Sequence, residues 1–505
     1  MGTRSRRHDP AKAAEPTRLI QRRGSPPSGV YGGSAATLPT HVVRAHGVRR
    51  AAADANVTAP TVTCDAPATH ADAPPEGPPR TKSASWFWPG LGIIVAVGLI
   101  WRIIYVAVIG TPDGTGGDPF YYHAQANLLA DGHGFADPFA WKLLHTHLQP
   151  TAQHPPLYSI LLSVVSWFGG QSYMAHKIAS SVIGAGTVLV IGLVGRRIGG
   201  PRVGLIAGGL AAAYPNLWLV DGLLLSEDLF ALTIGLTILA AYRFRDEPRV
   251  TNALLLGAGI GLATLVRGEA IMLVAVLTLP LVLLTRAVPP GRRIQLLVLS
   301  GVATVIVISP WVIRNMTTFK DPVVLSTNSY GVLAVANCDA TYHGQLIGFW
   351  YFNCDPGSKG DESQRAVVAR DRGLRYMGDH KERVPAVLAA RVGRVWELYR
   401  PWENAAFTQF EGRPLWGARA GLVSYWVLAA LAIPGFFFVH RRRLSIIPLI
   451  AQIILVTGIA AFAYGSVRFR LPAEVVIVAL AALTLDTAVR WVIDRCRRPA
   501  SAVAQ

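Results

Sequence analysis

The sequence predicts an all-α polytopic membrane protein, and three observations support that prediction. Hydrophobic residues make up 51% of the 505 residues, charged residues make up only 15%, and the mean hydropathy is +0.36. Soluble domains usually carry about 25% charged residues. Apolar runs close to the roughly 20 residues that cross a bilayer also recur along the chain. These observations disfavour a soluble protein.

About ten transmembrane helices are expected, separated by short polar connections. They lie near residues 88–109, 174–195, 203–223, 229–242, 252–266, 270–285, 294–313, 419–439, 444–464 and 471–491. The first seven belong to an N-terminal membrane module, residues 86–313, and the last three form C-terminal transmembrane helices within residues 419–493.

The two ends of the chain are interpreted as cytoplasmic tails. Residues 1–85 are rich in Ala, Pro, Arg and Thr, which predicts a disordered basic segment beside an anionic membrane face. Residues 494–505 form a second, short tail. Arginines also gather in every second connection, and an even number of spans then places both termini in the cytoplasm of a plasma-membrane protein.

This distribution also explains the net charge. The chain has 48 Lys and Arg against 30 Asp and Glu, a formal charge of +18. In a soluble protein that excess would suggest nucleic acid as a partner. Here most of it lies in the cytoplasmic loops and tails, so nucleic acid is not expected.

Two long connections face the opposite compartment. The first, residues 111–173, contains the short apolar piece 155–168, which is expected to be an interfacial helix. The second, residues 314–418, is expected to form a small outer subdomain with helices over residues 362–378 and 385–399. This subdomain also contains Cys338 and Cys354 in a compartment that permits a disulfide, which is the expected pairing. Metal binding by the cysteines is the weaker alternative.

Polar residues from six connections or helix ends map to this outer face. They are Asp118, His123, His154, Glu227, Asp228, Arg267, Glu269, Arg314, Asn315, Arg468 and Arg470. The span centres are mostly apolar, whereas an ion-coupled transporter should place charges near the midplane. The main exception is Arg102 in the first span, which is expected to have a structural or tuning partner such as Asp118 or Asp113. The pattern favours a site at the outer interface.

The same residues carry a family resemblance. The motifs Gly117-Asp118-Pro119-Phe120-Tyr121-Tyr122 and His154-Pro155-Pro156-Leu157-Tyr158 occur in the first outer loop. Later matches, in order, are Leu225-Ser226-Glu227, Val266-Arg267-Gly268-Glu269, Pro310-Trp311-Val312-Ile313-Arg314-Asn315, Ser326-Thr327-Asn328 and Arg468-Phe469-Arg470-Leu471-Pro472. Over about residues 86–490 the chain resembles family 39 glycosyltransferases, the protein O-mannosyltransferase and aminoarabinose-transferase-like enzymes of the C-type membrane superfamily. Gly268 replaces a frequent Pro, and His154 stands where Lys is common.

The resemblance implies an inverting sugar transfer from a polyprenyl-phosphate donor on the outer side. A single displacement needs a carboxylate to accept the proton of the acceptor hydroxyl and cations to stabilise the departing phosphate. Asp118 is the expected general base, although an Asp before Pro can equally cap a helix. The expected donor-phosphate ligands are Arg267, Arg314, Arg468, Arg470 and His154. For these arginines, anchoring to lipid headgroups is the alternative role.

Other residues are expected to bind substrate or to support the site. They are Arg102, Tyr121, Tyr122, His123, Glu227, Asp228, Glu269, Asn315 and Asn328. Helix N-terminal stabilisation is the alternative for Glu227 and Asp228. The aromatic stretch 328–352 is a candidate wall for the acceptor or sugar.

A divalent cation is possible, but no ligand motif in the sequence supports one. No metal site is therefore predicted. The expected partners are the membrane, a polyprenyl-phosphate sugar lipid, and a glycan, lipid or protein acceptor. The identity of the sugar stays open. A transporter or flippase of a lipid-linked sugar, without transferase activity, remains the alternative function.

Overall fold

The protein is helical throughout the part that the structure describes. The computed structural model describes residues 85–109 and 116–497, and within them the only β-contact is an isolated bridge between Ala136 and Pro150. The predicted all-α fold is confirmed. The prediction for the N-terminal tail falls almost entirely outside the described residues, as does that for residues 498–505.

Five helices are long and apolar enough to cross a bilayer. They are α1 (Phe87–Ile104) with its π-helical continuation Tyr105–Ile109, α4 (Tyr173–Gly199), α10 (Pro290–Thr318), α16 (Leu415–Arg441) and the segment Val467–Cys496, which includes most of α18 (Leu471–Arg497). Each occupies a span that the sequence predicts.

The predicted span over residues 203–223 is not one straight helix. It divides into α5 (Pro201–Ala213), α6 (Pro215–Trp218) and a 3₁₀ turn, Leu219–Leu223, with a bend of 67°. The cause is Pro215, which disfavours helical geometry in the preceding residue, and Tyr214 is extended there. The bend directs the following irregular backbone toward the outer end of the bundle.

Four further helical segments occupy the remaining predicted spans. They are α7 (Glu227–Asp246), α8 (Val250–Val266), the segment Gly268–Leu283, which ends in α9 (Leu279–Leu283), and α17 (Ile447–Phe462). α7 has 20 residues but carries charges at both ends, and the other three are shorter than 18 residues. By length and composition alone, these four are therefore weaker candidates for spans.

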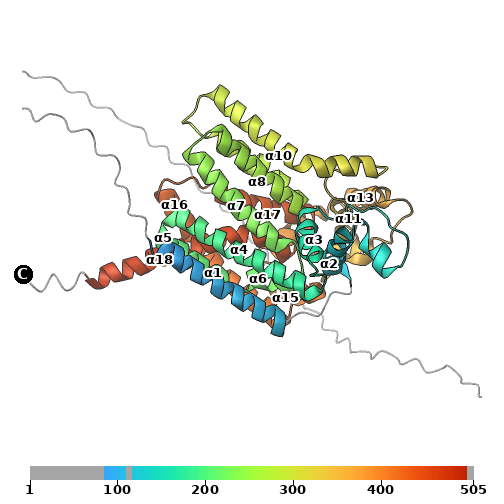
Figure 1. The fold of residues 1–505 in the computed structure, drawn as a ribbon, viewed down its shortest axis with the longest axis horizontal. Coiled ribbons are helices and arrows are strands. Elements are labelled where there is room, and N and C mark those ends of the chain that lie inside the picture. Colours follow the sequence, from blue (N-terminus) through green and yellow to red (C-terminus); the bar gives the residue numbers. More distant parts are fainter. Residues whose placement is uncertain (1–84, 110–115, 498–505) are drawn as a thin grey trace, which may run out of the picture. The chain divides into compact units, whose positions relative to one another are not determined.

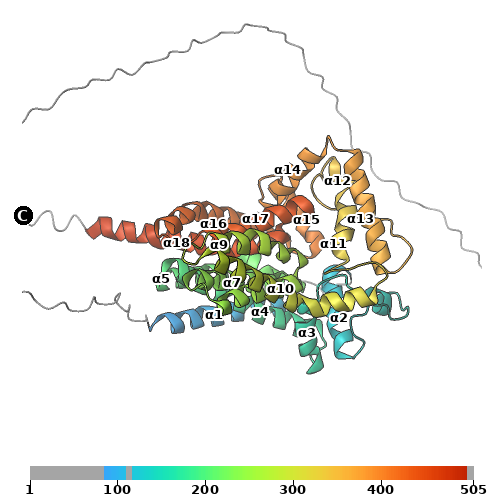
Figure 2. The same cartoon turned by 90° about the horizontal axis from the view of Figure 1, so that it is seen from above.

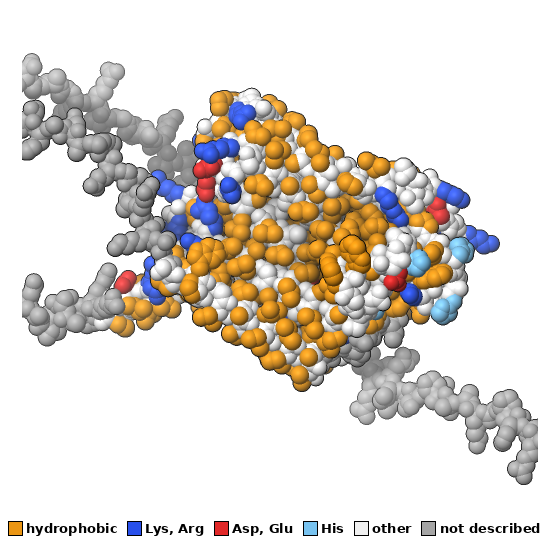
Figure 3. Space-filling view, viewed as in Figure 1, with side chains coloured by type: hydrophobic (Ala, Val, Ile, Leu, Met, Phe, Trp, Pro, Cys, Tyr) orange, Lys and Arg blue, Asp and Glu red, His pale blue; other side chains and the backbone are white. Residues whose placement is uncertain are grey.

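The long helices run alongside one another (Figures 1 and 2). The start of α1 and the end of α18 lie at one end of this bundle. The opposite end carries α2 (Gly117–Ala130), α3 (Leu157–Trp167), α11 (Asn328–Ala336) and α13 (Glu362–Asp379). On the face shown in Figure 3, an apolar surface separates charged groups at the two ends. This arrangement is expected of a bundle that crosses a membrane.

The core of the bundle is formed around α18, where apolar residues from Leu471 to Leu483 are buried on all sides. α4 and α5 approach closely through glycines. A Cβ atom on Gly204 would lie only 2.8 Å from the carbonyl oxygen of Gly192. Small residues permit such backbone contact between membrane helices.

The outer connections form helices close to those predicted. α3 lies within the predicted interfacial segment 155–168, and Trp167 and Phe168 at its end are strongly exposed. α13 begins with a capping box formed by Asp361 and Gln364. α14 (Val384–Val395) ends four residues before the predicted boundary, and α15 (Pro401–Phe407) follows.

Candidate functional site

Asp118 lies in the first turn of α2 and lines a cavity at the end of the bundle that carries α2 and α11. The helix begins one residue earlier, at Gly117, whose φ of +66° favours glycine. The N-cap residue is Gly116, and no side chain caps the helix. Asp118 is therefore not the cap that its position before Pro119 suggests, and its carboxylate is available for other contacts.

Arg468 is the main partner of Asp118. Its Nη2 donates to Asp118 Oδ2 at 2.7 Å, and its Nε donates to Glu227 Oε1 at 2.6 Å. Its Nη1 lies 3.7 Å from Glu411 Oε1. One guanidinium thus joins carboxylates from α2, from the first turn of α7 and from the second outer loop. Planar, multiply donating arginine is suited to this kind of contact.

A second arginine extends the cluster. Arg267 Nη1 donates to the same oxygen of Glu227 at 2.9 Å, and Arg267 Nε donates to Glu269 at 2.7 Å. The guanidinium also lies near the rings of Phe230 and Phe469. Arg267 therefore belongs to the cluster although Gly268 follows it where Pro is frequent, and carboxylates accept from its Nη1 and Nε.

The cavity has a volume of about 990 Å³, within the range of small-molecule sites. Its wall includes both partners of the central ion pair, Asp118 and Arg468. Other lining residues include Gln153, Tyr173, Lys177, Gly222, Leu223, Leu224, Leu225, Asn328, Trp350, Phe352, Asp355, Phe410, Glu411 and Tyr464. The irregular segment after the α5–α6 bend supplies Gly222 to Leu225. Non-helical backbone at such depth is tolerated where it lines a cavity.

His154 lies on the other side of Asp118. Its Nε2 is 3.4 Å from Asp118 Oδ1, and its ring packs against Tyr121 and Tyr122 with centroid separations of 4.8 and 4.9 Å. These two tyrosines are almost completely buried. They hold His154 in place beside the carboxylate, so their role is support.

The second outer loop holds the backbone just before His154. Glu362 Oε1 accepts from Ala152 N at 2.9 Å and from Thr327 Oγ1 at 2.6 Å. Ser326 Oγ donates to Gln153 O at 2.5 Å. The Ser326-Thr327 motif and Glu362 thus fix the segment that leads to His154 and, through it, to Asp118.

The electrostatics of the cluster favour an ionised Asp118. Burial raises the pKa of this carboxyl, but the Arg468 guanidinium and His154 outweigh burial, and the pKa lies well below its usual value. Glu411 behaves differently, because burial raises its pKa more than Arg468 and Arg413 lower it, while Glu227 and Asp118 raise it further. The pKa values of these two neighbouring acids are therefore shifted in opposite directions.

Two of the predicted phosphate ligands, Arg314 and Arg470, have contacts that favour a structural role. Arg314 donates to the backbone oxygens of Thr151 and Phe135 and to Asn315 Oδ1, so it anchors the first outer loop. Arg470 is completely buried, and its guanidinium contacts Glu397, Glu474 and the Tyr425 ring. Neither lines the cavity. Both arginines stabilise folded segments near the site.

The expected partner of Arg102 also requires correction. Arg102 Nη1 donates to Asp221 Oδ2 and to Leu217 O, and both charged side chains are fully buried. Asp118 is paired with Arg468 instead, and Asp113 lies outside the described residues. A Cβ atom on Gly184 would clash with this pair at 2.4 Å from Arg102 Nη1. The sequence could not indicate Asp221, because this pairing depends on how the segment after the Pro215 bend packs against α1.

The remaining predicted residues are divided between the cavity and the core. Asn328 lines the cavity, and so do Trp350 and Phe352 of the predicted aromatic wall. The His123 ring stacks on Tyr173, and its Nδ1 lies 3.0 Å from Nδ1 of His176. Asp228 and Asn315 are buried, and Asp228 accepts from its neighbour Leu229 N. These last two are structural in their contacts.

The sequence analysis missed Lys177, Tyr464 and Glu411, which all line the cavity. Lys177 is the fifth residue of α4, and no motif in the sequence distinguishes it from other lysines near helix ends. Glu411 comes from a short 3₁₀ turn, Thr408–Glu411, that ends at Gly412, with φ +88°. The Glu411-Gly412 pair could have indicated a tight turn next to an acid. The position of that turn beside the cavity depends on the tertiary fold.

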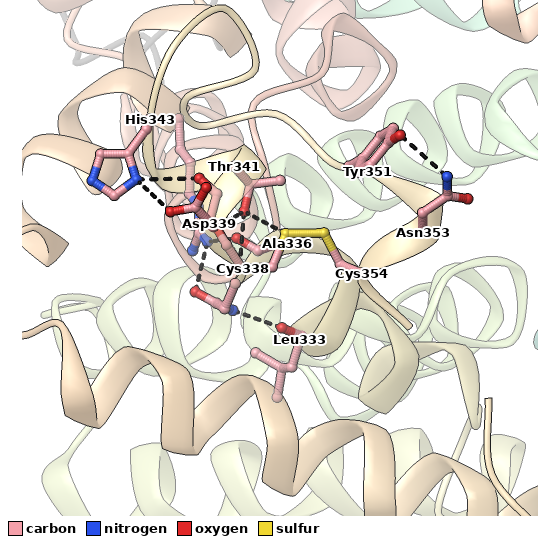
Figure 4. The surroundings of a disulfide bond; sticks show 11 residues. Leu333, Ala336, Cys338, Asp339, Thr341, His343, Tyr351, Asn353 and Cys354 are labelled. Atoms are coloured by element: carbon pink, nitrogen blue, oxygen red, sulfur yellow. Dashed lines mark hydrogen bonds and ion pairs between the residues drawn. A yellow bond between two sulfur atoms is a disulfide. The ribbon is translucent and has the colours of Figure 1, made fainter. Parts of the chain in front are cut away.

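Cys338 and Cys354 are joined by a disulfide bond, as the sequence analysis expects (Figure 4). The bond connects the start of α12 (Asp339–Tyr342) to a 3₁₀ turn, Phe352–Cys354. Trp350, Phe352 and Asp355 next to this turn line the cavity. The disulfide therefore anchors one wall of the candidate site.

A divalent cation receives no support from side-chain clustering. Across residues 85–109 and 116–497, no group of three or more His, Cys, Asp or Glu side chains is arranged to hold a metal ion. The acids of the site are instead bridged by arginines.

Residues 153–313 match the family model described as dolichyl-phosphate-mannose-protein mannosyltransferase. No curated protein sequence matches the chain. The matched segment includes His154, Glu227 and Arg267, and it ends just before Arg314.

Among solved structures, the fold is similar to the apo oligosaccharyltransferase of Archaeoglobus fulgidus, with a TM-score of 0.50 and 15% identity. That match covers 83% of this chain and 52% of the other, so the chain spans about half the length of that enzyme. ArnT from Cupriavidus metallidurans, bound to undecaprenyl phosphate, matches with a TM-score of 0.36 and 16% identity over 80% of this chain and 78% of that chain.

Proposed function

We propose that this chain is a membrane glycosyltransferase of the C-type superfamily that transfers a sugar from a polyprenyl-phosphate donor to an acceptor hydroxyl with inversion at the anomeric carbon. The observation that carries the proposal is the pairing of Asp118 with Arg468 on the wall of one cavity. This pairing places a base and a cation side by side at the end of a membrane bundle. The family model that matches residues 153–313 is named for a lipid-phosphate sugar, dolichyl-phosphate mannose, which supports a polyprenyl-phosphate donor.

In this proposal Asp118 accepts the proton of the acceptor hydroxyl as the hydroxyl oxygen attacks the anomeric carbon. The bond from that carbon to the phosphate oxygen breaks on the opposite face, and the phosphate leaves with the electron pair. One displacement of this kind inverts the anomeric centre. Its two requirements, proton removal and stabilisation of the leaving anion, correspond to the carboxylate and the cation.

The leaving phosphate is stabilised by the two cations on the cavity wall, Arg468 and Lys177. In this proposal Lys177 takes the role that the sequence analysis gave to Arg314 and Arg470, which do not line the cavity. Arg267 supports Arg468 indirectly, because both arginines bind the same oxygen of Glu227. The lipid tail of a polyprenyl phosphate lies in the bilayer, so its headgroup is expected at the helix ends where these cations lie.

Arg468 also regulates the base. Without substrate, its guanidinium holds Asp118 at 2.7 Å and lowers the carboxyl pKa. A donor phosphate competes for the same guanidinium, and weakening of the Arg468–Asp118 contact raises the pKa of Asp118. The carboxylate then becomes a stronger base when the donor is bound.

The active site is assigned to the outer face. Helix α2, which carries Asp118 of the cavity wall, lies at the end of the bundle opposite the start of α1 and the end of α18 (Figure 2). The start of α1 and the end of α18 are continuous in sequence with the basic tails. Basic segments favour the cytoplasmic side. A periplasmic or extracellular acceptor follows, and it is a glycan, a lipid or a protein.

The test uses membrane vesicles of known orientation that contain the full chain. Labelled polyprenyl-phosphate mannose, arabinose and glucose are supplied in turn, and both the glycosylated product and the sidedness of the lipid are measured. We expect product formation from the outer leaflet with one of these donors. Movement of the lipid between leaflets without any glycosidic product would replace the proposal with a flippase.

A further inference from the structure

The proposed reaction leaves two acids of the cavity wall unused, Asp355 and Glu411. Asp355 is paired with Arg372, whereas Glu411 makes no such short contact. Its side chain is only 6% exposed, and it lies at the end of the 3₁₀ turn Thr408–Glu411. Gly412 follows with φ +88°, and a Cβ atom there would lie 3.1 Å from Leu223 on the same wall. The turn therefore fixes Glu411 against the cavity.

Neither carboxylate oxygen of Glu411 has a hydrogen-bond partner among the described residues. Its nearest cation, Arg468, is 3.7 Å away, and the short contacts of that guanidinium go to Asp118 and Glu227. Buried polar groups are nearly always hydrogen-bonded, and an unsatisfied one costs about 1–3 kcal/mol. The missing partner of Glu411 is therefore expected from the content of the cavity.

Two aromatic residues complete this part of the wall. Trp350 lines the cavity, and its buried Nε1 has no acceptor among the described residues. Tyr464 lines the same cavity as Glu411 and Arg468, and its ring centroid is 6.3 Å from that of Trp350. A carboxyl group, an indole N–H and aromatic faces together match a sugar ring, which has hydroxyls on its edge and apolar C–H groups on its faces.

We infer that Glu411, Trp350 and Tyr464 form a sugar-hydroxyl subsite, in which Glu411 binds one or two ring hydroxyls and selects the glycosyl unit. The inference rests on the proposed transferase function and deepens it. Burial raises the pKa of the Glu411 carboxyl above its usual value. The hydroxyls come from the donor sugar or from a sugar acceptor.

The first test compares transfer kinetics of the full-length wild type with Glu411→Gln, Glu411→Leu and Trp350→Phe. Glu411→Leu keeps the approximate size of the side chain but removes its hydrogen bonds, so kcat/KM should fall by about ten- to a hundredfold. Glu411→Gln, which still donates and accepts, should lose less. Glu382→Leu is the matched control, because Glu382 is exposed on the same outer subdomain.

The second test separates the two sources and does not depend on turnover. Thermal stability of the purified chain is measured with polyprenyl phosphate alone and with polyprenyl-phosphate mannose, arabinose or glucose. If the donor sugar is bound, Glu411→Leu retains the stabilisation by the bare lipid and loses the additional stabilisation by the sugar. If an acceptor sugar is bound, Glu411→Leu keeps the additional stabilisation by the donor sugar, and its KM for the acceptor rises instead.

These tests distinguish failure of the subsite from failure of the proposed function. If wild type transfers sugar and Glu411→Leu behaves like Glu382→Leu in both tests, the subsite is wrong and the transferase stands. If wild type forms no product but Glu411→Leu removes the stabilisation by sugar lipid, the transferase is wrong and the sugar subsite stands. Loss of stabilisation by bare polyprenyl phosphate in both Glu411 variants would also overturn the subsite, because the defect would not be specific to sugar.

Discussion

The Asp118 carboxylate and the Arg468 guanidinium meet at 2.7 Å although 350 residues separate them in the sequence. The contact joins the first outer loop to the start of the last transmembrane segment, and Glu227 on α7 accepts from the same guanidinium. Three separate parts of the chain therefore converge on one side chain. Substitution of Arg468 should change both the position and the proton affinity of the proposed base.

Arg468 and Arg470 should respond differently to substitution. Arg468→Lys keeps the positive charge but loses the fork that reaches Asp118 and Glu227, so transfer should fall about a hundredfold or more while the protein remains folded. Arg470→Lys disturbs a fully buried contact with Glu397 and Glu474, and its main effect should be a lower melting temperature. Kinetics and thermal unfolding of both variants test this contrast. Equal loss of activity at equal stability would contradict it.

The pH dependence should show that Asp118 is already ionised in the free enzyme. Because Arg468 and His154 lower its pKa despite burial, wild-type kcat/KM should have no acid limb from Asp118 between pH 5 and 8. In Arg468→Gln the cation is absent and burial raises the pKa, so the residual activity should fall as the pH is lowered. A wild-type acid limb in this range that persists in His154→Gln would contradict the prediction.

Glu362 is predicted to position His154 without touching substrate. Glu362→Ala removes the acceptor for Ala152 N and Thr327 Oγ1, and the segment before His154 should become less ordered. We expect kcat to fall with little change in donor KM, and Glu362→Gln, which keeps an acceptor oxygen, should restore most activity. The control is Glu382→Ala, at an exposed position. A Glu362→Gln variant as impaired as Glu362→Ala would show that hydrogen bonding is not the cause.

The buried pair Arg102–Asp221 should be important for stability. Arg102→Leu leaves Asp221 charged or forced to neutralise in a fully buried position, and should destabilise the protein by about 3–5 kcal/mol. Replacing both partners by leucine removes the isolated charge, so the double variant should be more stable than the single one. Thermal unfolding in detergent measures the difference. If the double variant were as unstable as the single variant, packing rather than charge would be responsible.

Removing the disulfide should affect the cavity wall. Cys338 and Cys354 are 16 residues apart, and closing a loop of about this length is worth roughly 3 kcal/mol in the chain-entropy model. Cys338→Ser/Cys354→Ser should therefore lower the melting temperature and raise KM, because the bond holds the turn beside Trp350 and Asp355. Cys496→Ser, at an exposed free cysteine, is the control. An unchanged KM in the double variant would show that the disulfide does not contribute to substrate binding.

The membrane fold was predictable because its signal is local. Runs of apolar residues define the helices. Two predicted spans differ from a straight α-helix: one bends at Pro215, and the segment Gly268–Leu283 combines 3₁₀, π and α turns. The alternation of spans and connections also predicted that Asp118, His154, Glu227 and Arg267 lie at one end of the bundle, and the structure brings them together there. These residues lie at helix ends or in short motifs, where sequence position determines the depth of a residue in the membrane.

The partners of each charge were not predictable in the same way. Arg314 and Arg468 have similar sequence contexts at helix ends, yet Arg314 donates to the backbone of the first outer loop and Arg468 to the proposed base. Asp221 and Glu411 reach their positions through a bend and a turn, so no local pattern indicated their neighbours. No motif in the sequence distinguished Lys177 from other lysines near helix ends. Assigning ion pairs requires the tertiary arrangement of the helices.

The most direct test of the central claim is transfer of a labelled sugar from a polyprenyl-phosphate donor by Asp118→Asn in membranes. Asparagine keeps the shape of the side chain but cannot accept the proton at neutral pH, so product formation should fall by about 10²–10⁴-fold at equal protein level and with retained binding of polyprenyl phosphate. Asp321→Asn, at an outer position that does not line the cavity, should retain wild-type activity. Transfer by Asp118→Asn at the wild-type rate would contradict the assignment of Asp118 as the base.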